Sequence, residues 1–391
     1  MLCGPGRRYI VGKMKRTLIV SHQFEEAVFL KRTNSHTIRI RLHARESCCY
    51  LPAAGNEETL LIPGSRVFVS ASKKLPEGLL HRAISTVYQK SYVLLDRQQP
   101  ARILYELAKA GLLFGPSSDT AAVKKNARIG PGRFDLLIER RTRHPLIVTA
   151  ELCSLCHNGI ALIPEAGGEV PACVQYCAPA GHEQCTMFLV TSSSARTFIP
   201  NIHTNPGFCR SLFEAEKVAF GAVGCTLVDP VTVDLDSAHN LECDLETARE
   251  NDTNMGSYLL VLENRRSREI PVGKLGCLLF KAGYYVYVGS GMNGVDKRVA
   301  RHRSGNKRHH WHIDHITPAP MRITRVYTIR RKARLEGEIA ARMERIAPRP
   351  IQGFGSSDSK KSSHLFYFPG PPNHRRDFLD LVMDFMTFSA P

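Results

Sequence analysis

Hydrophobic residues follow three different patterns in three successive parts of the chain, which excludes one continuous helical or sheet fold. Residues 15–95 hold short runs of β-branched and aromatic residues, and residues 37–42 alternate strictly between polar and apolar side chains. That alternation predicts a strand with one buried face. Several such runs, separated by turns such as Pro63-Gly64, predict a small β-barrel or sandwich over residues 15–95.

Residues 96–228 mix helical and strand patterns. A helical spacing of apolar residues begins at Ile103, and a second helical stretch lies at 207–221. Strands are predicted at 134–138, 146–150, 187–190 and 225–228. This mixture predicts an α/β layer, and a chain of 391 residues is long enough for two or three domains.

A strongly acidic stretch follows this second part. Between residues 229 and 252 eight side chains are acidic and one, Arg249, is basic. The acidic residues are Asp229, Asp234, Asp236, Glu242, Asp244, Glu246, Glu250 and Asp252. Such a stretch between two folded parts predicts a solvated linker, placed at residues 229–253. A second interpretation, in which it covers a neighbouring basic groove, remains open.

Most of the positive charge lies in the last third of the chain. From residue 254 to residue 391 there are 24 Lys and Arg against 11 Asp and Glu, so this part contributes +13 of the net +17. Such an excess favours a polyanionic partner, DNA first, with RNA as an alternative. No apolar run of 18 residues occurs, the first residues lack an apolar signal region, and the 12 cysteines are scattered. We therefore expect a reduced, cytoplasmic protein without a membrane partner.

Tyrosines on predicted strands and charged side chains on predicted helices mark the last part as a candidate site. Strands are predicted at 256–262 and 283–290, and helices at 297–302 and 333–343. These elements carry Tyr258, Tyr285, Tyr287, Arg298, His302 and Glu336. Tyr285 and Tyr287 are two residues apart on a predicted strand, so they lie on the same face of it. Arg298 and His302 are four residues apart on a predicted helix, so they also share a face.

This set of side chains suits phosphodiester hydrolysis. A tyrosine or histidine can hold or deprotonate the attacking water, and an arginine can clamp the phosphoryl oxygens. A carboxylate can bind one Mg²⁺ that stabilises the leaving oxygen. The alternative is that the tyrosines pack in a core and that the arginine and histidine lie on a solvated helix face.

The order of motifs in this part resembles the GIY-YIG endonuclease superfamily. Gly256-Ser257-Tyr258 is similar to the first half of its signature, and Tyr287-Val288-Gly289 is similar to the second half. A compact, uncharacterised branch found mostly in archaea is closer still, on the segments at 283–290, 311–314, 336–340, 353–358 and 363–367. The gap between the two tyrosine motifs is long, as in that branch. Cysteines common there are replaced by Gly337, Ser359 and Lys361, which removes any thiol or zinc role.

The resemblance implies a role for each candidate residue. Tyr258 would activate the water with Tyr287 in support. Arg298 would stabilise the phosphate beside His302, and Glu336 would carry the divalent metal, expected to be Mg²⁺. Three further residues are implied to lie near the site without assigned roles, namely His312, Asp314 and His364.

A basic run in the same part is a candidate nucleic-acid contact. Between residues 297 and 313 there are six Lys and Arg, four His and no acid. Besides Arg298, the basic residues are Lys297, Arg301, Arg303, Lys307 and Arg308. Each one that meets a phosphate adds about one unit to the salt dependence of binding. A solubilising surface loop and a histidine metal site are the alternatives.

The first two parts resemble the sugar fermentation stimulation (SfsA) family, on residues 61–67, 133–137, 151–153 and 164–166. That family pairs an OB-like domain with a restriction-nuclease-like domain and is regarded as DNA-binding. In the PD-(D/E)xK scheme Asp135 and Glu151 fit the two carboxylates, but Cys153 stands where the lysine belongs. This second centre is interpreted as vestigial, which leaves a DNA-binding or scaffolding module. Zinc-like spacing of Cys153, Cys156, His157, Cys173, Cys177 and Cys185 is a further alternative to buried core cysteines.

These observations predict an α+β multidomain protein. Its parts are an OB-like β domain at 15–95, a restriction-nuclease-like α/β domain at 96–228, the linker at 229–253 and a GIY-YIG-like domain at 254–391. The expected function is DNA binding with a metal-dependent endonuclease activity in the last domain. A non-catalytic DNA-binding regulator and a basic RNA-associated protein are the competing hypotheses.

Overall fold

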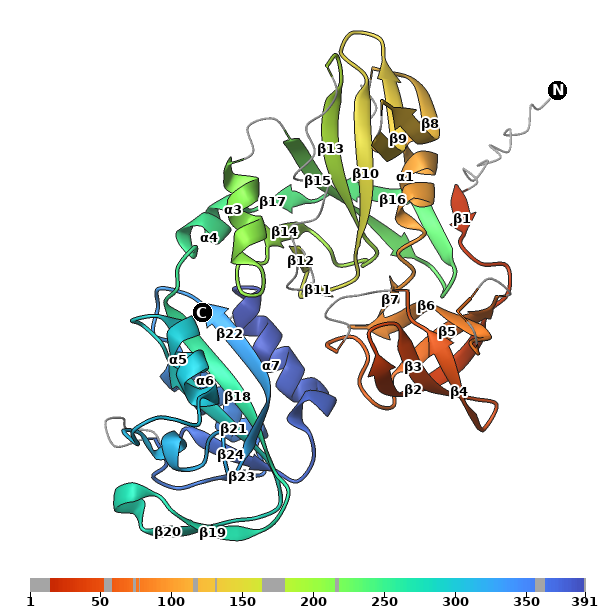
Figure 1. Cartoon of the computed structure of the whole chain (residues 1–391). Coiled ribbons are helices and arrows are strands. Elements are labelled where there is room, and N and C mark those ends of the chain that lie inside the picture. The colour runs from red at the N-terminus through yellow and green to blue at the C-terminus, as the bar shows by residue number, and fades with distance from the viewer. Residues whose placement is uncertain are drawn as a thin grey trace, which may run out of the picture.

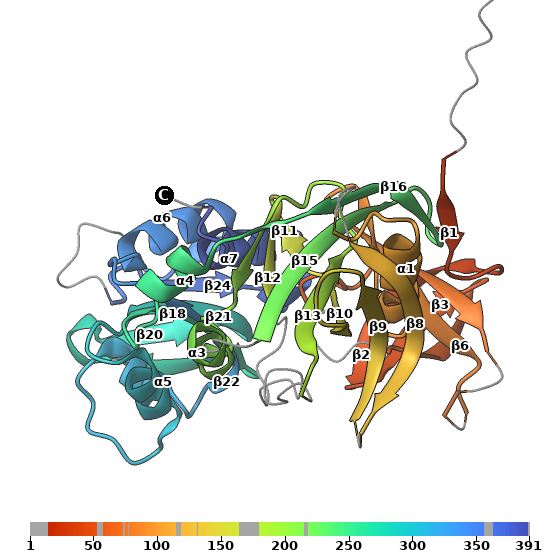
Figure 2. The same cartoon turned by 90° about the horizontal axis from the view of Figure 1, so that it is seen from above.

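The computed structural model describes residues 15–52, 58–72, 75–76, 78–114, 119–130, 132–163, 180–214, 218–355 and 363–389. These residues form a mixed α+β structure, with a small barrel, a central sheet and a C-terminal sheet flanked by helices (Figure 1). In both views the C-terminal part lies to one side of the central sheet (Figures 1 and 2). The predicted α+β class is therefore confirmed.

Five strands close into a barrel. They are β2 (Glu25–Asn34), β3 (Thr37–Leu42), β4 (Arg45–Tyr50), β5 (Arg66–Ala71) and β6 (His81–Tyr88). Strand β2 pairs with β3 and β5, strand β3 with β4, and β5 with β6, and a short parallel pairing of β4 with β6 closes the ring. Ile38, Ile40 and Leu42 alternate inward along β3 and are buried. The closed five-stranded arrangement is consistent with the expected OB-like barrel.

The central sheet continues from the barrel through one short strand. Its members are β7 (Ser91–Leu94), β8 (Thr120–Ile129), β9 (Gly132–Arg140), β10 (Leu146–Cys153), β13 (Glu183–Val190) and β15 (Val218–Leu227). Strand β7 pairs with β6 and, at one residue pair, with β15. Strands β15, β13 and β10 are parallel neighbours, and the hairpin of β9 and β8 extends the sheet beyond them. Helix α1 (Pro100–Lys109) packs its apolar stripe against this sheet.

A smaller sheet and two helices lie between the central sheet and the C-terminal part. They comprise β11 (Cys156–His157), β12 (Ile160–Ile163), β14 (Thr197–Pro200), β17 (Glu242–Cys243), α3 (Pro206–Glu214) and α4 (Leu245–Glu250). The helix predicted at 207–221 is too long, because α3 ends at Glu214 and the residues from 218 onward belong to β15.

Residues 229–253, expected to form a solvated linker, instead contain regular structure. Strand β16 (Thr232–Asn240) pairs with β15 and with β1 (Thr17–Ile19), and β17 and α4 follow it. Val233 and Leu235 of β16 are buried, while Asp236 accepts a hydrogen bond of 2.8 Å from Arg16. The acidic composition did not predict this strand, because the arginine that pairs with Asp236 lies more than 200 residues away in the sequence.

The C-terminal part is built on a five-stranded antiparallel sheet. Its strands in spatial order are β22 (Arg322–Arg330), β18 (Gly256–Asn264), β21 (Gly283–Ser290), β24 (Leu365–Phe368) and β23 (Arg349–Pro350). The helices are α5 (Val295–Arg303), α6 (Glu336–Ile346) and α7 (Arg376–Met386). A separate hairpin consists of β19 (Arg268–Pro271) and β20 (Cys277–Phe280) and projects from one end of the sheet (Figure 1).

Helix α7 joins the C-terminal part to the rest of the chain. Arg376 donates a hydrogen bond to the Thr59 carbonyl of the barrel. Asp384 lies 2.7 Å from Nε2 of His157 in β11. The apolar face of α7 belongs to a core cluster that also contains barrel residues. The three parts are therefore packed together rather than strung along a flexible connection.

Candidate functional site

The two neighbouring strands β18 and β21 hold the candidate tyrosines side by side. Tyr258 pairs in register with Gly289, and Leu260 pairs with Tyr287. The Tyr258 ring lies directly over Gly289, since a Cβ atom at that glycine would stand 2.4 Å from the Tyr258 hydroxyl. The second signature motif therefore needs its glycine to make room for the tyrosine of the first motif.

Helices α5 and α6 bring the charged residues to the same place. Together the strands and helices surround a cavity of about 440 Å³. Its lining includes all five residues that the sequence marked as catalytic, namely Tyr258, Tyr287, Arg298, His302 and Glu336. Residues separated by up to 78 positions in the sequence thus meet at one cavity, and His312 and His364 line it as well.

A short hydrogen bond links the first tyrosine to the helix. The Tyr258 hydroxyl lies 2.7 Å from Nε2 of His302, and both side chains are buried. Burial raises the pKa of Tyr258 well above its ordinary value, and the nearby Tyr287 raises it further. Burial, with the nearby Lys307 charge, lowers the pKa of His302 to about 4. At neutral pH the pair is therefore a protonated phenol and a neutral imidazole that can accept its proton.

Asp314 lies behind this pair, fully buried, and organises the loop around it. Its carboxylate accepts hydrogen bonds from the backbone N–H groups of His310 and Trp311 and from Arg301. Lys307 forms an ion pair with it at 3.4 Å. Burial would raise the pKa of Asp314, but these hydrogen bonds and charges outweigh that effect and the pKa is lowered. Asp314 is therefore a charged anchor rather than a group that faces the cavity.

Arg298 reaches the cavity across an aromatic ring. Its guanidinium lies 4.1 Å from the centre of the Trp311 ring, and that of Arg301 lies 4.7 Å from it. No carboxylate among the described residues forms an ion pair with Arg298, so its donors remain available to an anion. Sequence reasoning assigned no role to Trp311, although a lone tryptophan inside a basic run was a usable signal.

Glu336 is the one carboxylate that lines the cavity among the described residues. It is the first residue of α6, its side chain is partly exposed, and its Oε1 atom lies 3.3 Å from Nδ1 of His364. The Nδ1 atom of His312 accepts a hydrogen bond of 3.0 Å from the Gly355 backbone. The cavity wall therefore offers one carboxylate beside two histidines.

The basic residues proposed to contact nucleic acid divide into two groups. Lys297, Arg303 and Arg308 are exposed. Lys307 is not, because its ammonium group is engaged with Asp314 and with the Thr317 hydroxyl at 3.0 Å. Arg301 is likewise held by Asp314. The structure therefore gives Lys307 and Arg301 a role inside the protein that the sequence did not indicate.

The second candidate centre lies on β9 and β10. Asp135 accepts a hydrogen bond of 2.8 Å from the Ala150 backbone. Burial raises the pKa of Glu151 against the opposing charge of Arg97, and the charge of Asp135 raises it further. Cys153 is buried in an apolar cluster, so the position that the resemblance assigns to a water-polarising lysine holds a core thiol.

The cysteines of the described residues do not gather into a metal site. Cys153, Cys156 and Cys185 are buried thiols, and no group of three metal-binding side chains occurs among the described residues. His157 is engaged by Tyr88 and Asp384 instead. Cys173, Cys177, residues 164–166 and residues 356–361 lie outside the described residues.

Within the described ranges no helix is long and apolar enough to cross a membrane.

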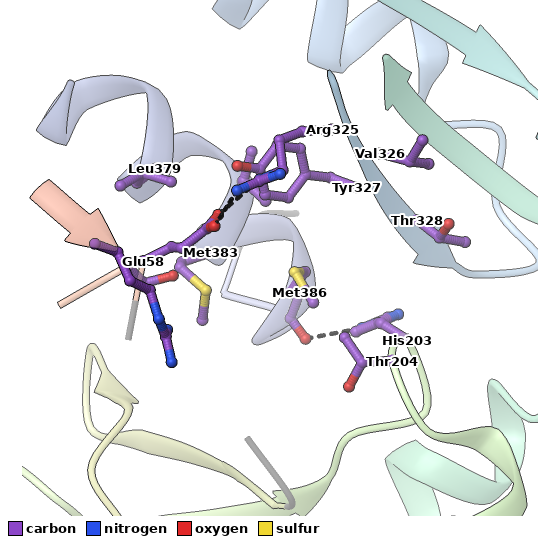
Figure 3. Close-up of a pocket in the computed structure, with 13 residues that line it drawn as sticks. Glu58, His203, Thr204, Arg325, Val326, Tyr327, Thr328, Leu379, Met383 and Met386 are labelled. Atoms are coloured by element: carbon purple, nitrogen blue, oxygen red, sulfur yellow. Dashed lines mark hydrogen bonds and ion pairs between the residues drawn. The ribbon is translucent and has the colours of Figure 1, made fainter. Parts of the chain in front are cut away.

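A second cavity, of about 400 Å³, lies where the three parts meet (Figure 3). Leu379, Met383 and Met386 of α7 line one side of it. Arg325 bonds to Glu58 across it, and His203 bonds to the Met386 carbonyl at 2.9 Å. None of the candidate catalytic residues lines this cavity.

Two buried histidines make the stability of the protein depend on pH. Burial lowers the pKa of His203 to about 3, and that of His302 is about 4, against 6.5 for the ordinary side chain. As the pH falls below 6.5 the unfolded chain takes up protons that the folded chain refuses, so stability present above that pH is lost toward pH 4. We expect the free energy of unfolding, measured by urea titration, to be about 2 kcal/mol lower per histidine at pH 5 than at pH 7. A His203→Gln variant should show a smaller difference, and equal stability of the parent protein at both pH values would contradict the argument.

Two family profiles match two separate parts of the chain. Residues 98–229 match the profile of the "Sugar fermentation stimulation protein RE domain". Residues 257–387 match the profile of "Domain of unknown function DUF123", a GIY-YIG-like family. Both resemblances seen in the sequence are thereby confirmed.

The individual relatives fall within the first of these classes. A "Sugar fermentation stimulation protein homolog" of Desulfitobacterium hafniense is 25% identical over 210 residues, which cover 52% of this chain and 90% of the relative. One of Moorella thermoacetica is 26% identical over 217 residues, which cover 54% of this chain and 93% of the relative. The solved structure of Pyrococcus furiosus SfsA in complex with Ca²⁺ aligns with a TM-score of 0.47 at 16% identity, over 59% of this chain and 100% of that one.

Proposed function

We propose that this chain is a DNA-binding protein whose C-terminal cavity hydrolyses phosphodiester bonds with a divalent metal ion, as a GIY-YIG-like endonuclease. The observation that carries the proposal is the convergence of Tyr258, Tyr287, Arg298, His302 and Glu336 on one cavity. The excess of positive charge after residue 254 and the two family matches support nucleic acid as the ligand.

In this proposal the Tyr258–His302 pair moves the proton of the attacking water. The raised pKa of Tyr258 makes a free phenolate unfavourable at neutral pH. Because the hydroxyl is hydrogen bonded to Nε2 of His302, tyrosine can pass its own proton to the imidazole while it takes one from water. The imidazolium that results would face the Asp314 carboxylate, 3.9 Å from Nδ1.

Arg298 supplies the positive charge for the phosphoryl group. Its guanidinium is oriented by the ring of Trp311, so little side-chain freedom is lost when an anion binds. Two parallel N–H groups of arginine match two phosphoryl oxygens, and this pairing strengthens as charge accumulates in the transition state.

The donor set at Glu336 fits a single, largely hydrated Mg²⁺ ion. Mg²⁺ is commonly held by one or two carboxylates together with waters and substrate phosphates, and Glu336 is a partly exposed carboxylate beside the cavity. Glu336 would hold the ion, with His364 fixing the orientation of its carboxylate. A bound ion would neutralise charge on the leaving oxygen.

The exposed basic residues near α5 and the central sheet are assigned to binding. Lys297, Arg303 and Arg308 are exposed on and after α5, where they can meet backbone phosphates beside the cavity. The central sheet is assigned a binding or scaffolding role, because Cys153 cannot replace the missing lysine.

Incubation of the purified chain with branched, linear and single-stranded DNA tests this function. We expect cleavage with Mg²⁺, none with EDTA, and a loss of about a hundredfold in the single-turnover rate of Tyr258→Phe. Affinity for DNA should change little in that variant. Binding without cleavage of any substrate, in Mg²⁺ or Mn²⁺, would instead support a non-catalytic DNA-binding regulator. Tighter binding of RNA than of DNA at the same salt concentration would support an RNA-associated protein.

A further inference from the structure

Trp311 is the only tryptophan in the chain, and it lines the cavity that holds the candidate catalytic residues. Trp311 is 39% exposed. Of the large hydrophobic side chains that are exposed in the described part of the chain, it alone borders this cavity. Because the ring is both accessible and part of the cavity lining, it is a candidate contact for a ligand that enters the cavity.

The Trp311 ring is contacted by two arginine side chains of α5 and by the rings of His302 and His310. The guanidinium groups of Arg298 and Arg301, one helical turn apart on α5, lie 4.1 Å and 4.7 Å from its centre. The Trp311 backbone N–H donates to Asp314, a buried carboxylate that also binds Arg301. These contacts orient the ring, and part of the residue remains accessible to a ligand.

The chemistry of this platform selects a flat aromatic ligand, and the cavity beside it is proposed to receive a phosphodiester. A nucleotide offers both groups. Inside a continuous double helix each base is covered on both faces by its neighbours, so an indole can reach only its edge. An unpaired base offers a whole face, and stacking on tryptophan tolerates any of the four bases.

We infer that Trp311 stacks on an unpaired base adjacent to the phosphodiester that enters the cavity. The preferred substrate then carries a single-stranded segment, such as an overhang or a flap, and a continuous duplex is a poor ligand. This inference rests on the proposed function only for the identity of the cavity's ligand. It concerns binding and not cleavage.

Tryptophan fluorescence tests the inference directly, because one indole gives the whole signal. The parent protein is titrated in EDTA, at fixed salt, with a blunt duplex, with the same duplex carrying a short overhang, and with the single strand. We expect quenching by the overhang and the single strand, and little quenching by the blunt duplex at equal occupancy. An overhang that contains abasic sites keeps every phosphate, and it should bind about tenfold more weakly than the intact overhang.

Variants separate stacking from charge. Trp311→Leu should lose about tenfold in affinity for the overhang and stay within about twofold for the blunt duplex, while Trp311→Phe keeps most of the preference. The matched control is Phe24→Leu, which removes another exposed ring, 42% exposed, on the barrel side of the molecule. It should leave the preference unchanged.

Equal quenching by all three ligands, or an abasic overhang that binds as tightly as the intact one, would overturn the inference. Loss of the preference in Phe24→Leu but not in Trp311→Leu would also overturn it, in favour of the barrel. If the quenching pattern holds and no DNA is cleaved, the nuclease proposal fails while this inference stands. If blunt duplex is cleaved as fast as overhang substrates and no selective quenching is seen, the nuclease proposal stands and this inference fails.

Discussion

Replacement of Glu336 by glutamine is expected to abolish cleavage, with a loss of about a thousandfold or more in the single-turnover rate. The substitution keeps the shape of the side chain and removes the one carboxylate that lines the cavity among the described residues. In the proposed mechanism the site would then lose its ligand for Mg²⁺ and, with it, the stabilisation of the leaving oxygen. DNA affinity, measured by fluorescence anisotropy in EDTA, should not fall.

Glu338 provides the matched control for this experiment. It also lies in the first turn of α6 and affects the helix dipole equally, but it does not line the cavity. Glu338→Gln should cleave at nearly the parent rate. Binding of Mn²⁺, followed by electron paramagnetic resonance, should weaken in Glu336→Gln alone. If both variants lose the same activity, or if Glu336→Gln stays active, the carboxylate is not the metal ligand.

Removal of the Asp314 carboxylate is expected to destabilise the C-terminal part by about 3–5 kcal/mol, the usual cost of a buried charge left without its partner. In Asp314→Ala the ammonium group of Lys307, whose side chain is 3% exposed, remains buried beside Arg301 without a counter-charge. Two backbone N–H groups lose their acceptor at the same time. Urea unfolding, followed by the fluorescence of the single tryptophan, reports on this part of the chain, because the backbone N–H of Trp311 is hydrogen bonded to the Asp314 carboxylate.

Two further variants show whether charge is the cause. Lys307→Met in the Asp314→Ala background removes the orphaned cation and should recover part of the loss. Glu46→Gln breaks an exposed ion pair with Arg39 and should cost less than about 1 kcal/mol. A loss in Asp314→Ala no larger than in Glu46→Gln would show that Asp314 is not the anchor described above.

Local patterns in the sequence predicted the site elements well. The strand expected at 283–290 has the same limits as β21, and the helix expected at 297–302 lies within α5. Each of these predictions depends on residues that are close in sequence, where spacing alone fixes which side chains share a face. The grouping of the five candidate residues came from the family resemblance, because spacing says nothing about how strands and helices meet.

Predictions that depended on charge alone were less successful. A count of basic residues could not show that Lys307 and Arg301 face an internal carboxylate rather than a ligand. The acidic stretch was expected to be solvated, although Asp236 and Asp252 are paired with arginines from distant segments. In both cases the partner lies on another element, and only the fold reveals it.

The contacts of α7 have a consequence for how a long ligand would be held. This helix bonds to the barrel loop at Thr59, to β11 at His157 and to the loop at His203. Rotation of the C-terminal part against the barrel would have to break all three contacts together. A polynucleotide that reached both surfaces would therefore follow a track of fixed length, and nuclease footprints should end at a constant distance from the scissile bond.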